Sequence, residues 1–406
     1  MKSWKYSILL LAGIGVSYLG SWIYLIAINL SILNLTGSAA AVAGLYVIRP
    51  IAILITNTWA GSVIDRVNKR KLMIGVDVIR GLLVFLIPLI ESLWFIYFIL
   101  LLINIAGAFF GPSSSVYITK LIPAENRKRF NSLMSMAGSG AFLLGPAIAG
   151  VLIMLFGTDL CIYINAVTFL VCAWFIYLLP DVDTEVKEKR DPVTWNMLVG
   201  DWRTVKRFAR GASYFVIVYL LFQGAMLTGF ALDSQEVTFI KQHLMLSDQD
   251  YGWIVSLTGL GALAGAAVAA MISQKVQLRY YIGAGMFFTS VGYLMFYASF
   301  DFLTATLAFV FLGFFMAFAN AGYATFFQQN VPVEIMGRFG SIADMLQAMV
   351  QIMLTLILGV AADWFSLQVA CIVFSISGVF LAAALLVTVL RPSKKEYFEE
   401  SKGVVL

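Results

Sequence analysis

Apolar runs long enough to cross a membrane as helices recur along the whole of this 406-residue chain. The hydrocarbon core of a bilayer is about 30 Å thick, and an α-helix crosses it in about 20 residues. A transmembrane β-strand needs only about 10 residues and alternates apolar with polar side chains, a pattern that these runs lack. Only 12% of the residues are charged, against about a quarter in soluble domains. The chain is therefore predicted to be an all-α integral membrane protein.

The runs form two groups of six, and a polar segment separates the groups. We predict an N-terminal six-helix bundle at residues 1–180, a cytoplasmic linker at 181–210, a C-terminal six-helix bundle at 211–395 and a cytoplasmic tail at 396–406. Within the linker, Trp195–Arg210 is expected to form an amphipathic helix at the membrane interface. The twelve predicted spans cover residues 7–33, 38–63, 72–90, 93–118, 130–156, 159–179, 211–240, 250–273, 280–299, 302–327, 339–362 and 366–390.

An internal repeat relates the two groups of spans. Residues 129–132 read Arg-Phe-Asn-Ser and residues 338–341 read Arg-Phe-Gly-Ser, 209 positions later, and each tetrapeptide starts six residues after a proline. The same offset aligns residues 61–70 with 270–279, although several of these positions match poorly. Two separate segments that share one offset indicate a duplication of a six-helix unit.

The basic residues predict how the chain is oriented in the membrane. Of 27 Lys and Arg residues, Arg49 and Arg80 lie within spans, Lys241 lies on one side, and the other 24 share the opposite side with both termini and the linker. An excess of basic residues marks the cytoplasmic side. We therefore expect both termini in the cytoplasm. The loops on the other side are short, which excludes a receptor ectodomain.

Residue types that hold metals or nucleotides are scarce. His243 is the only histidine, and Cys161, Cys172 and Cys371 are scattered through apolar runs, so we expect no metal site and no cofactor. The chain has no Gly-x-x-x-x-Gly-Lys-Ser/Thr loop for a nucleotide. Its basic residues are explained by membrane topology, so no nucleic-acid partner is expected. Any transport would draw on an ion gradient, the membrane potential or the gradient of the substrate.

The loop between the second and third spans carries the most specific motif. Residues 61–71 read Gly-Ser-Val-Ile-Asp-Arg-Val-Asn-Lys-Arg-Lys, which resembles the signature loop of the major facilitator superfamily. A glycine permits close helix approach, and the aspartate can accept charge-assisted hydrogen bonds that hold one conformer. The resemblance implies a conformational latch at Gly61, Asp65, Arg66 and Arg70.

Two departures from the family pattern limit this interpretation. Asn68 stands where the family usually has glycine, and Gln274 replaces the acid in the second copy of the loop, so a latch there is weak or absent. The alternative is that the basic residues of the loop only set topology and meet anionic lipid headgroups.

Residues 140–150 in the fifth span read Gly-Ala-Phe-Leu-Leu-Gly-Pro-Ala-Ile-Ala-Gly and resemble the Gly-Pro motif of antiporters in the same superfamily. Proline removes a backbone donor and kinks a helix, and glycines let a neighbouring helix approach. We expect that neighbour to be the eighth span, which is rich in glycine. The alternative is a generic contact between small residues. The residues of the motif are Gly140, Gly145, Pro146 and Gly150.

A charged side chain in the hydrocarbon core costs several kcal/mol unless it faces water or a partner, so each one marks a candidate site. Arg49 is the deepest, about 16 Å along the helix from Ser38. Asp233 and Glu236 are three residues apart in the outer part of the seventh span and are expected to share a face. Two close carboxylates repel when both are ionised, which favours a proton-coupling site, with Arg49 neutralising one acid. The alternatives are a structural pair for Arg49 and a wet outer mouth for the acids.

Other charged residues are expected near the cytoplasmic ends of the spans. Asp77 and Arg80 are an i, i+3 pair in the third span, and Asp344 begins a polar stripe in the eleventh. We predict an inner gate there, against the alternative of a structural role. Aromatic side chains would suit a cavity for bulky amphipathic ligands, although such residues more often face lipid. The predicted gate comprises Asp77, Arg80, Arg129, Arg338 and Asp344.

Within the superfamily, residues 65–77 and the Pro-Ala-Glu-Asn-Arg loop at 123–127 resemble the macrolide-efflux type of exporter. The resemblance implies a transporter of the bacterial inner membrane that exports an amphipathic small molecule from the cytoplasm by alternating access in exchange for protons. We expect it to be monomeric and not an enzyme. Acids outnumber bases in the spans, which favours a cationic substrate. A lipid or lysolipid translocator, a siderophore or metabolite exporter, a nutrient symporter and a non-transporting sensor that docks partners on its linker stay open as alternatives.

Overall fold

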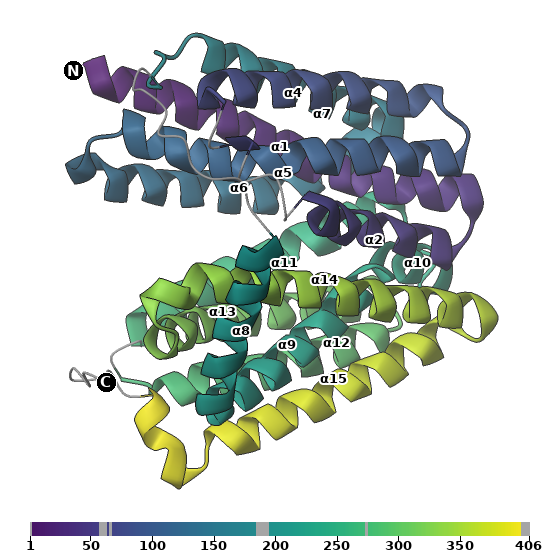
Figure 1. The fold of residues 1–406 in the computed structure, drawn as a ribbon. Helices are drawn as coiled ribbons and strands as arrows, with labels where there is room; N and C mark the ends of the chain where they lie inside the picture. The colour runs from purple at the N-terminus through teal and green to yellow at the C-terminus, as the bar shows by residue number, and fades with distance from the viewer. Residues whose placement is uncertain (1, 57–62, 65–66, 184–194, 273–274, 399–406) are drawn as a thin grey trace. The chain divides into compact units, whose positions relative to one another are not determined.

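The protein is helical throughout the part of the chain that the structure describes (Figure 1). The structure is a computed structural model that describes residues 2–56, 63–64, 67–183, 195–272 and 275–398, and no strand occurs among them. The helices are α1 (Lys2–Thr36), α2 (Ala39–Thr56), α4 (Lys69–Leu86), α5 (Leu93–Leu121), α6 (Ala124–Phe156), α7 (Thr158–Tyr177), α8 (Trp195–Gly211), α9 (Ser213–Asp233), α10 (Glu236–Thr238), α11 (Asp248–Ile272), α12 (Leu278–Tyr297), α13 (Phe302–Asn330), α14 (Val333–Trp364) and α15 (Leu367–Val389). Three short helical turns are η1 (Ile87–Leu89), η2 (Phe239–His243) and η3 (Pro392–Phe398).

Eleven helices of the described residues are long and apolar enough to cross a membrane. The ninth predicted span corresponds to α12, which has 20 residues and is therefore long enough to cross the hydrocarbon core. α12 is not among these eleven, because its tyrosines and glycines lower its hydropathy. When α12 is counted as the twelfth span, the fold is an all-α integral membrane architecture of twelve helices in two sets of six, as the sequence predicts.

The helix boundaries repeat with the offset found in the sequence. α2 starts at Ala39 and α11 at Asp248, and α4 starts at Lys69 and α12 at Leu278, 209 positions apart in each case. The pairs α5 and α13, α6 and α14, and α7 and α15 also start 209 positions apart. The duplication therefore extends over the helices of both halves, including those whose sequences have lost visible similarity.

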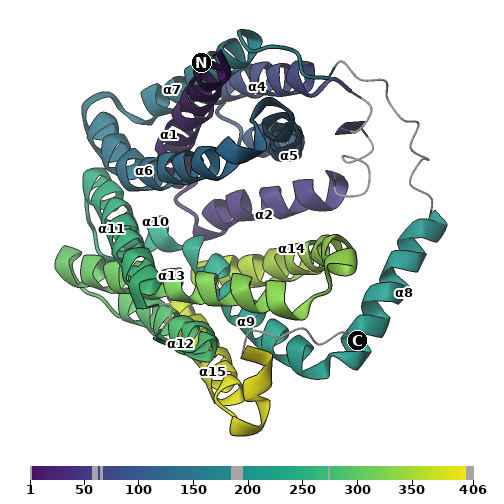
Figure 2. The same cartoon turned by 90° about the vertical axis from the view of Figure 1, so that its left-hand side faces the viewer.

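The chain forms two compact units: residues 1–193 with 247–256, and residues 194–246 with 257–406. In the first unit α1 packs along α6 and α7, and in the second α12 packs along α13 and α15 (Figures 1 and 2). Residues 247–256, the first part of α11, belong to the first unit although they follow the linker in sequence.

The repeated tetrapeptides occupy equivalent places in the two cores. Phe130 is 1% exposed in a cluster with Leu10 and Tyr117, and Phe339 is 6% exposed in a cluster with Phe215 and other side chains of the second unit. Each phenylalanine lies shortly after a helix start that proline caps, at Pro123 for α6 and Pro332 for α14. The repeat thus preserves a packing residue at the start of the fifth membrane-spanning helix of each half.

Close backbone contact explains why glycine is frequent in α12. A Cβ atom at Gly285 would lie 2.6 Å from the backbone nitrogen of Ala319, and one at Gly292 would lie 2.8 Å from the Cβ of Leu312. Both partners belong to α13, so larger residues at these two positions would push the helices apart.

The seventh predicted span, residues 211–240, is not one continuous helix. α9 ends at Asp233, a turn follows at residues 234–235, and α10 leads into the π-helical turn η2. Asp233 therefore ends one helix and Glu236 begins the next, across a turn of two residues, so the two acids do not lie on one unbroken helix. That they share a face stays a prediction. Hydropathy alone does not reveal this turn, since the segment stays apolar on both sides of it.

Two segments outside the spans pack on the second unit. α8 lies in the predicted linker, and its Phe208 ring contacts the rings of Phe215 and Phe339 at centroid distances of 5.7 and 6.1 Å. At the other end, η3 places Phe398 on Phe326, with ring centroids 5.2 Å apart. The helix expected at Trp195–Arg210 is confirmed as α8.

Candidate functional site

The predicted latch lies partly beyond the described residues. Gly61, Asp65 and Arg66 fall in the segments 57–62 and 65–66, outside the part of the chain that the structure describes. Arg70 is described, and its guanidinium donates to the last carbonyls of α7: Nε to Ile176 O at 3.3 Å, and Nη2 to Tyr177 O. A cation at the C-terminus of a helix satisfies carbonyls that have no intrahelical partner. Arg70 thus joins the start of α4 to the end of α7.

Asn68, which stands where the family has glycine, has two structural roles. Its Oδ1 accepts a hydrogen bond from Lys71 N at 2.9 Å and thereby caps α4. Its Nδ2 donates to both carboxylate oxygens of Asp181, at 2.8 and 2.7 Å. The hydrogen bond from Asn68, together with one from the backbone of Asp183, lowers the pKa of Asp181. Glycine has no side chain to form either contact.

Asp183 is held at the same place by two lysines. Its carboxylate accepts a hydrogen bond of 2.6 Å from Lys69 N and one of 2.9 Å from Lys120 Nζ. Partial burial opposes ionisation, but the contacts with Lys120 and Lys69 outweigh it and lower the pKa of Asp183. We call Asn68, Lys69, Lys120, Asp181 and Asp183 the linker anchor. The sequence offered no signal for it, since Asn68 and Asp181 are 113 residues apart.

The charges of α4 form an ion pair inside the first unit. Arg80 Nη1 lies 3.6 Å from Asp77 Oδ1, and the two side chains are 21% and 0% exposed. No described N–H or O–H group donates to the Asp77 carboxylate, although the Cys172 thiol lies beside it. The Arg80 guanidinium stacks 3.9 Å from the centroid of the Phe169 ring. A charge so buried is tolerated because its counter-charge is one helical turn away.

The pair lies well inside its helix. α4 begins at Lys69, so Asp77 lies about 12 Å and Arg80 about 16 Å along the helix axis from its start. The pair therefore lies near the middle of α4, and its place in an inner gate stays a prediction.

The Gly-Pro helix contacts α11 as expected at one glycine. A Cβ atom at Gly252 would lie 2.5 Å from Pro146 O and 2.9 Å from the Cα of Gly150. Ser256, one turn further along α11, donates a hydrogen bond to Leu143 O. These contacts lie within the first unit, and the two glycines allow the backbones to touch.

The other glycines of that motif have different surroundings. A Cβ at Gly145 would lie 2.5 Å from the Cβ of Trp22, so Gly145 accommodates α1 rather than α11. Around Gly140 no heavy atom of the described residues lies within 4 Å of a Cβ position. The expectation that Gly145 packs on the eighth span is therefore wrong, because it faces another side of the helix from Gly150.

The acids after α9 are held in a buried, largely polar turn of the second unit. Tyr293 Oη donates to Asp233 Oδ1 at 2.8 Å, and Tyr297 Oη donates to Leu232 O. Glu236 is partly buried, and its Oε1 has no hydrogen-bond partner among the described residues. The charges of Asp233 and Glu236 are close enough to act on each other. Neither acid forms an ion pair within the described part of the chain.

The predicted partner of these acids lies in the other unit. Arg49 is exposed in α2, next to Pro50, and forms no ion pair with a described residue. Neutralisation of Asp233 or Glu236 by Arg49 stays a prediction. Arg338 is exposed at the start of α14, and the side chain of Arg129 is outside the described part.

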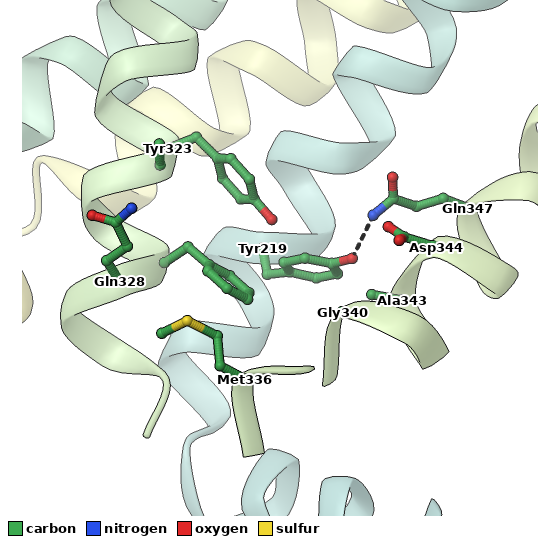
Figure 3. A pocket seen from close by; sticks show the side chains of 10 residues that line it. Tyr219, Tyr323, Gln328, Met336, Gly340, Ala343, Asp344 and Gln347 are labelled. Atoms are coloured by element: carbon green, nitrogen blue, oxygen red, sulfur yellow. Dashed lines mark hydrogen bonds between the residues drawn. The ribbon is translucent and has the colours of Figure 1, made fainter. Parts of the chain in front are cut away.

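An aromatic cavity opens in the second unit among α9, α13 and α14 (Figure 3). Its volume is about 380 Å³. Gln347 Nε2 donates to Tyr219 Oη at 2.7 Å, and Asp344 lies beside this pair (Figure 3). Sequence analysis placed Asp344 on a polar stripe but missed the tyrosines, because they come from two other helices. The lining residues are Tyr219, Tyr323, Ala324, Phe327, Gln328, Met336, Gly340, Ala343, Asp344 and Gln347.

Comparison with known proteins gives one family for nearly the whole chain. The family model described as Major Facilitator Superfamily matches residues 10–235 and 236–405. The "Uncharacterized MFS-type transporter YfiS" of Bacillus subtilis (strain 168) is 22% identical over 94% of this chain and 92% of its own length. "Multidrug resistance protein 2" of the same organism is 24% identical over 66% of each chain. "Multidrug resistance protein MdtH" of Salmonella arizonae is 27% identical over 39% of each chain.

Solved structures of other transporters share the fold. The D-xylose-proton symporter has a TM-score of 0.72 at 16% identity and covers 99% of both chains. The nucleoside transporter NupG has a TM-score of 0.70 at 16% identity, covering 95% of this chain and 99% of its own. Similarity at this level of identity concerns the architecture alone.

Proposed function

Because this chain belongs to the Major Facilitator Superfamily, we propose that it is a secondary active transporter that exports amphipathic small molecules in exchange for protons. The names of the multidrug resistance relatives support export. The proposed location is the bacterial inner membrane with both termini in the cytoplasm, which the distribution of basic residues supports. Macrolide-like drugs are the first substrates to test, given the motif at residues 65–77.

The acid pair after α9 is the observation that carries proton coupling. A buried carboxylate needs a cation, donors or water to remain ionised. Asp233 has the Tyr293 hydroxyl, whereas Glu236 Oε1 has no donor among the described residues. The two charges also act on each other, so a single proton shared by the pair relieves both the repulsion and the missing donor. Such a pair takes up a proton when its surroundings dry and releases it when water enters.

The proposed cycle follows from this property. The pair exchanges protons with outside water while the transport pathway is open to the outside, and it takes up a proton as the pathway closes and the water leaves. Protonation makes it neutral and favours the inward-open conformer, in which the substrate binds from the cytoplasm or the inner leaflet. Loss of the proton to the cytoplasm then restores the charge. Gly61, Asp65, Arg66 and Arg70 are proposed to hold one of the two conformers, and Asp77, Arg80, Arg129, Arg338 and Asp344 to line the inner gate.

The contact between α6 and α11 supports a sealed pathway. Backbone contact at Gly150 and Gly252 leaves no room for water between the two helices. We propose that the Gly-Pro motif, Gly140, Gly145, Pro146 and Gly150, keeps this seam tight during the cycle, with Gly150 in the principal contact and Gly145 seating α1.

The test is proton-driven transport in proteoliposomes with an imposed pH gradient. Substrate uptake measures transport, and a pH-sensitive dye inside the vesicles measures proton movement. The double variant Asp233→Asn, Glu236→Gln is expected to lose pH-driven transport at least 10-fold while keeping exchange of labelled for unlabelled substrate. The matched control, Glu91→Gln with Asp159→Asn, removes two exposed acids and should transport normally. Undiminished pH-driven transport by the acid variant would refute the coupling site. Including lysolipids and siderophores among the substrates tests the alternative exporters in the same assay.

A further inference from the structure

The cavity of the second unit has the features of a site for an organic cation. Three aromatic rings surround it, with centroids 6.3 Å apart for Tyr219 and Tyr323 and 6.1 Å apart for Tyr323 and Phe327. Faces of aromatic rings attract cations through their quadrupole. Its volume of about 380 Å³ is near the lower end of the range for small-molecule sites, which suits one bulky end of a ligand.

One carboxylate faces this aromatic wall without a counter-charge. Asp344 forms no ion pair or hydrogen bond with any described residue, yet it is close enough to Tyr219 and Tyr323 for its charge to act on both hydroxyls. The described lining of the cavity contains no Lys or Arg. A cation bound here therefore meets attraction from the carboxylate and the rings, and no positive group in the described lining opposes it.

The position of Tyr219 is fixed by its neighbours. Its hydroxyl accepts a hydrogen bond of 2.7 Å from Gln347, and its ring lies 5.2 Å from the buried Phe339 ring in an edge-to-face arrangement. Tyr323 stacks on Phe222 at 4.4 Å. The rings are thus held before a ligand arrives, which reduces the ordering cost of binding.

We propose that this cavity binds the cationic, aromatic end of an amphipathic substrate, with Asp344 as counter-charge and Tyr219, Tyr323 and Phe327 as the wall on which it stacks. The proposal rests on the proposed function, because it identifies the class of molecule that the transporter would carry. It also assigns Asp344 to recognition of the substrate rather than only to gating.

The test compares two ligands of nearly equal shape and different charge. Methyltriphenylphosphonium is a cation and triphenylphosphine oxide is neutral, and both bring three aromatic rings. Binding to purified full-length protein in nanodiscs is measured by equilibrium dialysis, with empty nanodiscs correcting for partition into lipid. Wild-type protein is expected to bind the cation at least 10-fold more tightly than the neutral compound.

The variants separate charge from aromatic contact. Asp344→Asn is expected to weaken binding of the cation about 10-fold and leave the neutral compound within 2-fold. Tyr323→Leu should weaken binding of both ligands. Tyr219→Phe keeps the ring and should stay within about 3-fold of wild type. Asp363→Asn removes an exposed acid from the same helix, 19 residues beyond Asp344, and should change neither.

Equal binding of the cation and the neutral compound by wild-type protein, or unchanged cation binding by Asp344→Asn, overturns the proposal. A variant that loses both ligands together with its thermal transition has failed to fold, and Asp344→Glu then provides the test, since it should retain the preference for the cation. Cation binding that depends on Asp344 without proton-driven transport would leave this site standing and reject the proposed function. Proton-driven transport that Asp344→Asn leaves unchanged would leave the proposed function standing and reject this site.

Discussion

Asp77 and Met286 occupy the same place in the two halves, 209 positions apart, and so do Arg80 and Thr289. The first half buries an ion pair there, while the second has an apolar and a neutral side chain. The reverse holds at the first helix of each half, where Tyr24 corresponds to Asp233. Asp233, Glu236 and Asp344 form no ion pair within the described residues. One helical frame thus carries a neutralised ion pair and the unpaired Arg49 in the first half, and three acids without an ion-pair partner among the described residues in the second.

This difference teaches where a carrier can exchange protons and bind ligands. A charge neutralised by its own helix is available neither to a proton nor to a substrate unless the pair breaks. A buried acid without a counter-charge is stabilised either by taking up a proton or by binding a cationic substrate. We therefore assign coupling and recognition to the second half, and a balanced pair of charges at the proposed inner gate to the first. The following experiments break or sharpen this contrast.

The largest effects on stability are expected at the buried phenylalanine that both halves have kept. Phe130→Ala and Phe339→Ala each remove a buried ring from the start of the fifth helix of a half, and each should lower the free energy of unfolding by about 3–5 kcal/mol. Unfolding in mixed detergent micelles measures both. Phe300→Ala, which removes an exposed ring, serves as the control. A cost below about 1 kcal/mol for either buried position would contradict the shared frame.

Transplanting the residues of the second half into the first tests the ion pair. Asp77→Met alone leaves Arg80 without its counter-charge and should cost about 2–4 kcal/mol, allowing for the partial exposure of Arg80. The double variant Asp77→Met, Arg80→Thr reproduces the pair found in α12 and should recover most of that loss. The coupling energy comes from a double-mutant cycle on the same unfolding measurement. Additive losses would show that the two side chains act independently.

The glycine seam permits a comparison of two alanine substitutions. Gly252→Ala puts a methyl group 2.5 Å from Pro146 O and should destabilise the protein by about 1–3 kcal/mol. Gly140→Ala meets no described atom within 4 Å and should be neutral or stabilising by up to about 1 kcal/mol. Thermal unfolding monitored by tryptophan fluorescence compares the two variants. Equal melting temperatures would remove the case for close contact at Gly252.

The smallest effect concerns the linker anchor, which has no matching acid pair in the second half. The pKa values of Asp181 and Asp183 are lowered in the folded protein, so their contribution to stability is present above the unfolded value of about 4 and is lost as pH falls through the lower folded values. The hydrogen-exchange protection factors of the amides in residues 178–183, which compare the measured rate with the intrinsic rate at the same pH, should therefore be high at neutral pH and fall at acid pH.

Two variants of the anchor provide controls. Asp181→Asn with Asp183→Asn should show low protection factors at every pH. Asn68→Ala should cost about 1 kcal/mol through loss of the helix cap, and Asn68→Gly less. Protection factors of the wild-type protein that stay the same at neutral and acid pH would mean that the two carboxylates do not hold the segment.

Local pattern and chain length were enough to determine the membrane class, the two sets of six helices and the 209-residue register, because a span must be apolar over a fixed length and a duplication preserves spacing. The ion pair of α4 was also readable, since residues three apart on a helix are neighbours. Tertiary structure decided the rest. Asn68 meets Asp181, Tyr293 meets Asp233, and three helices bring Tyr219, Tyr323 and Asp344 together. Those partners are far apart in the chain, and only helix packing sets which faces meet.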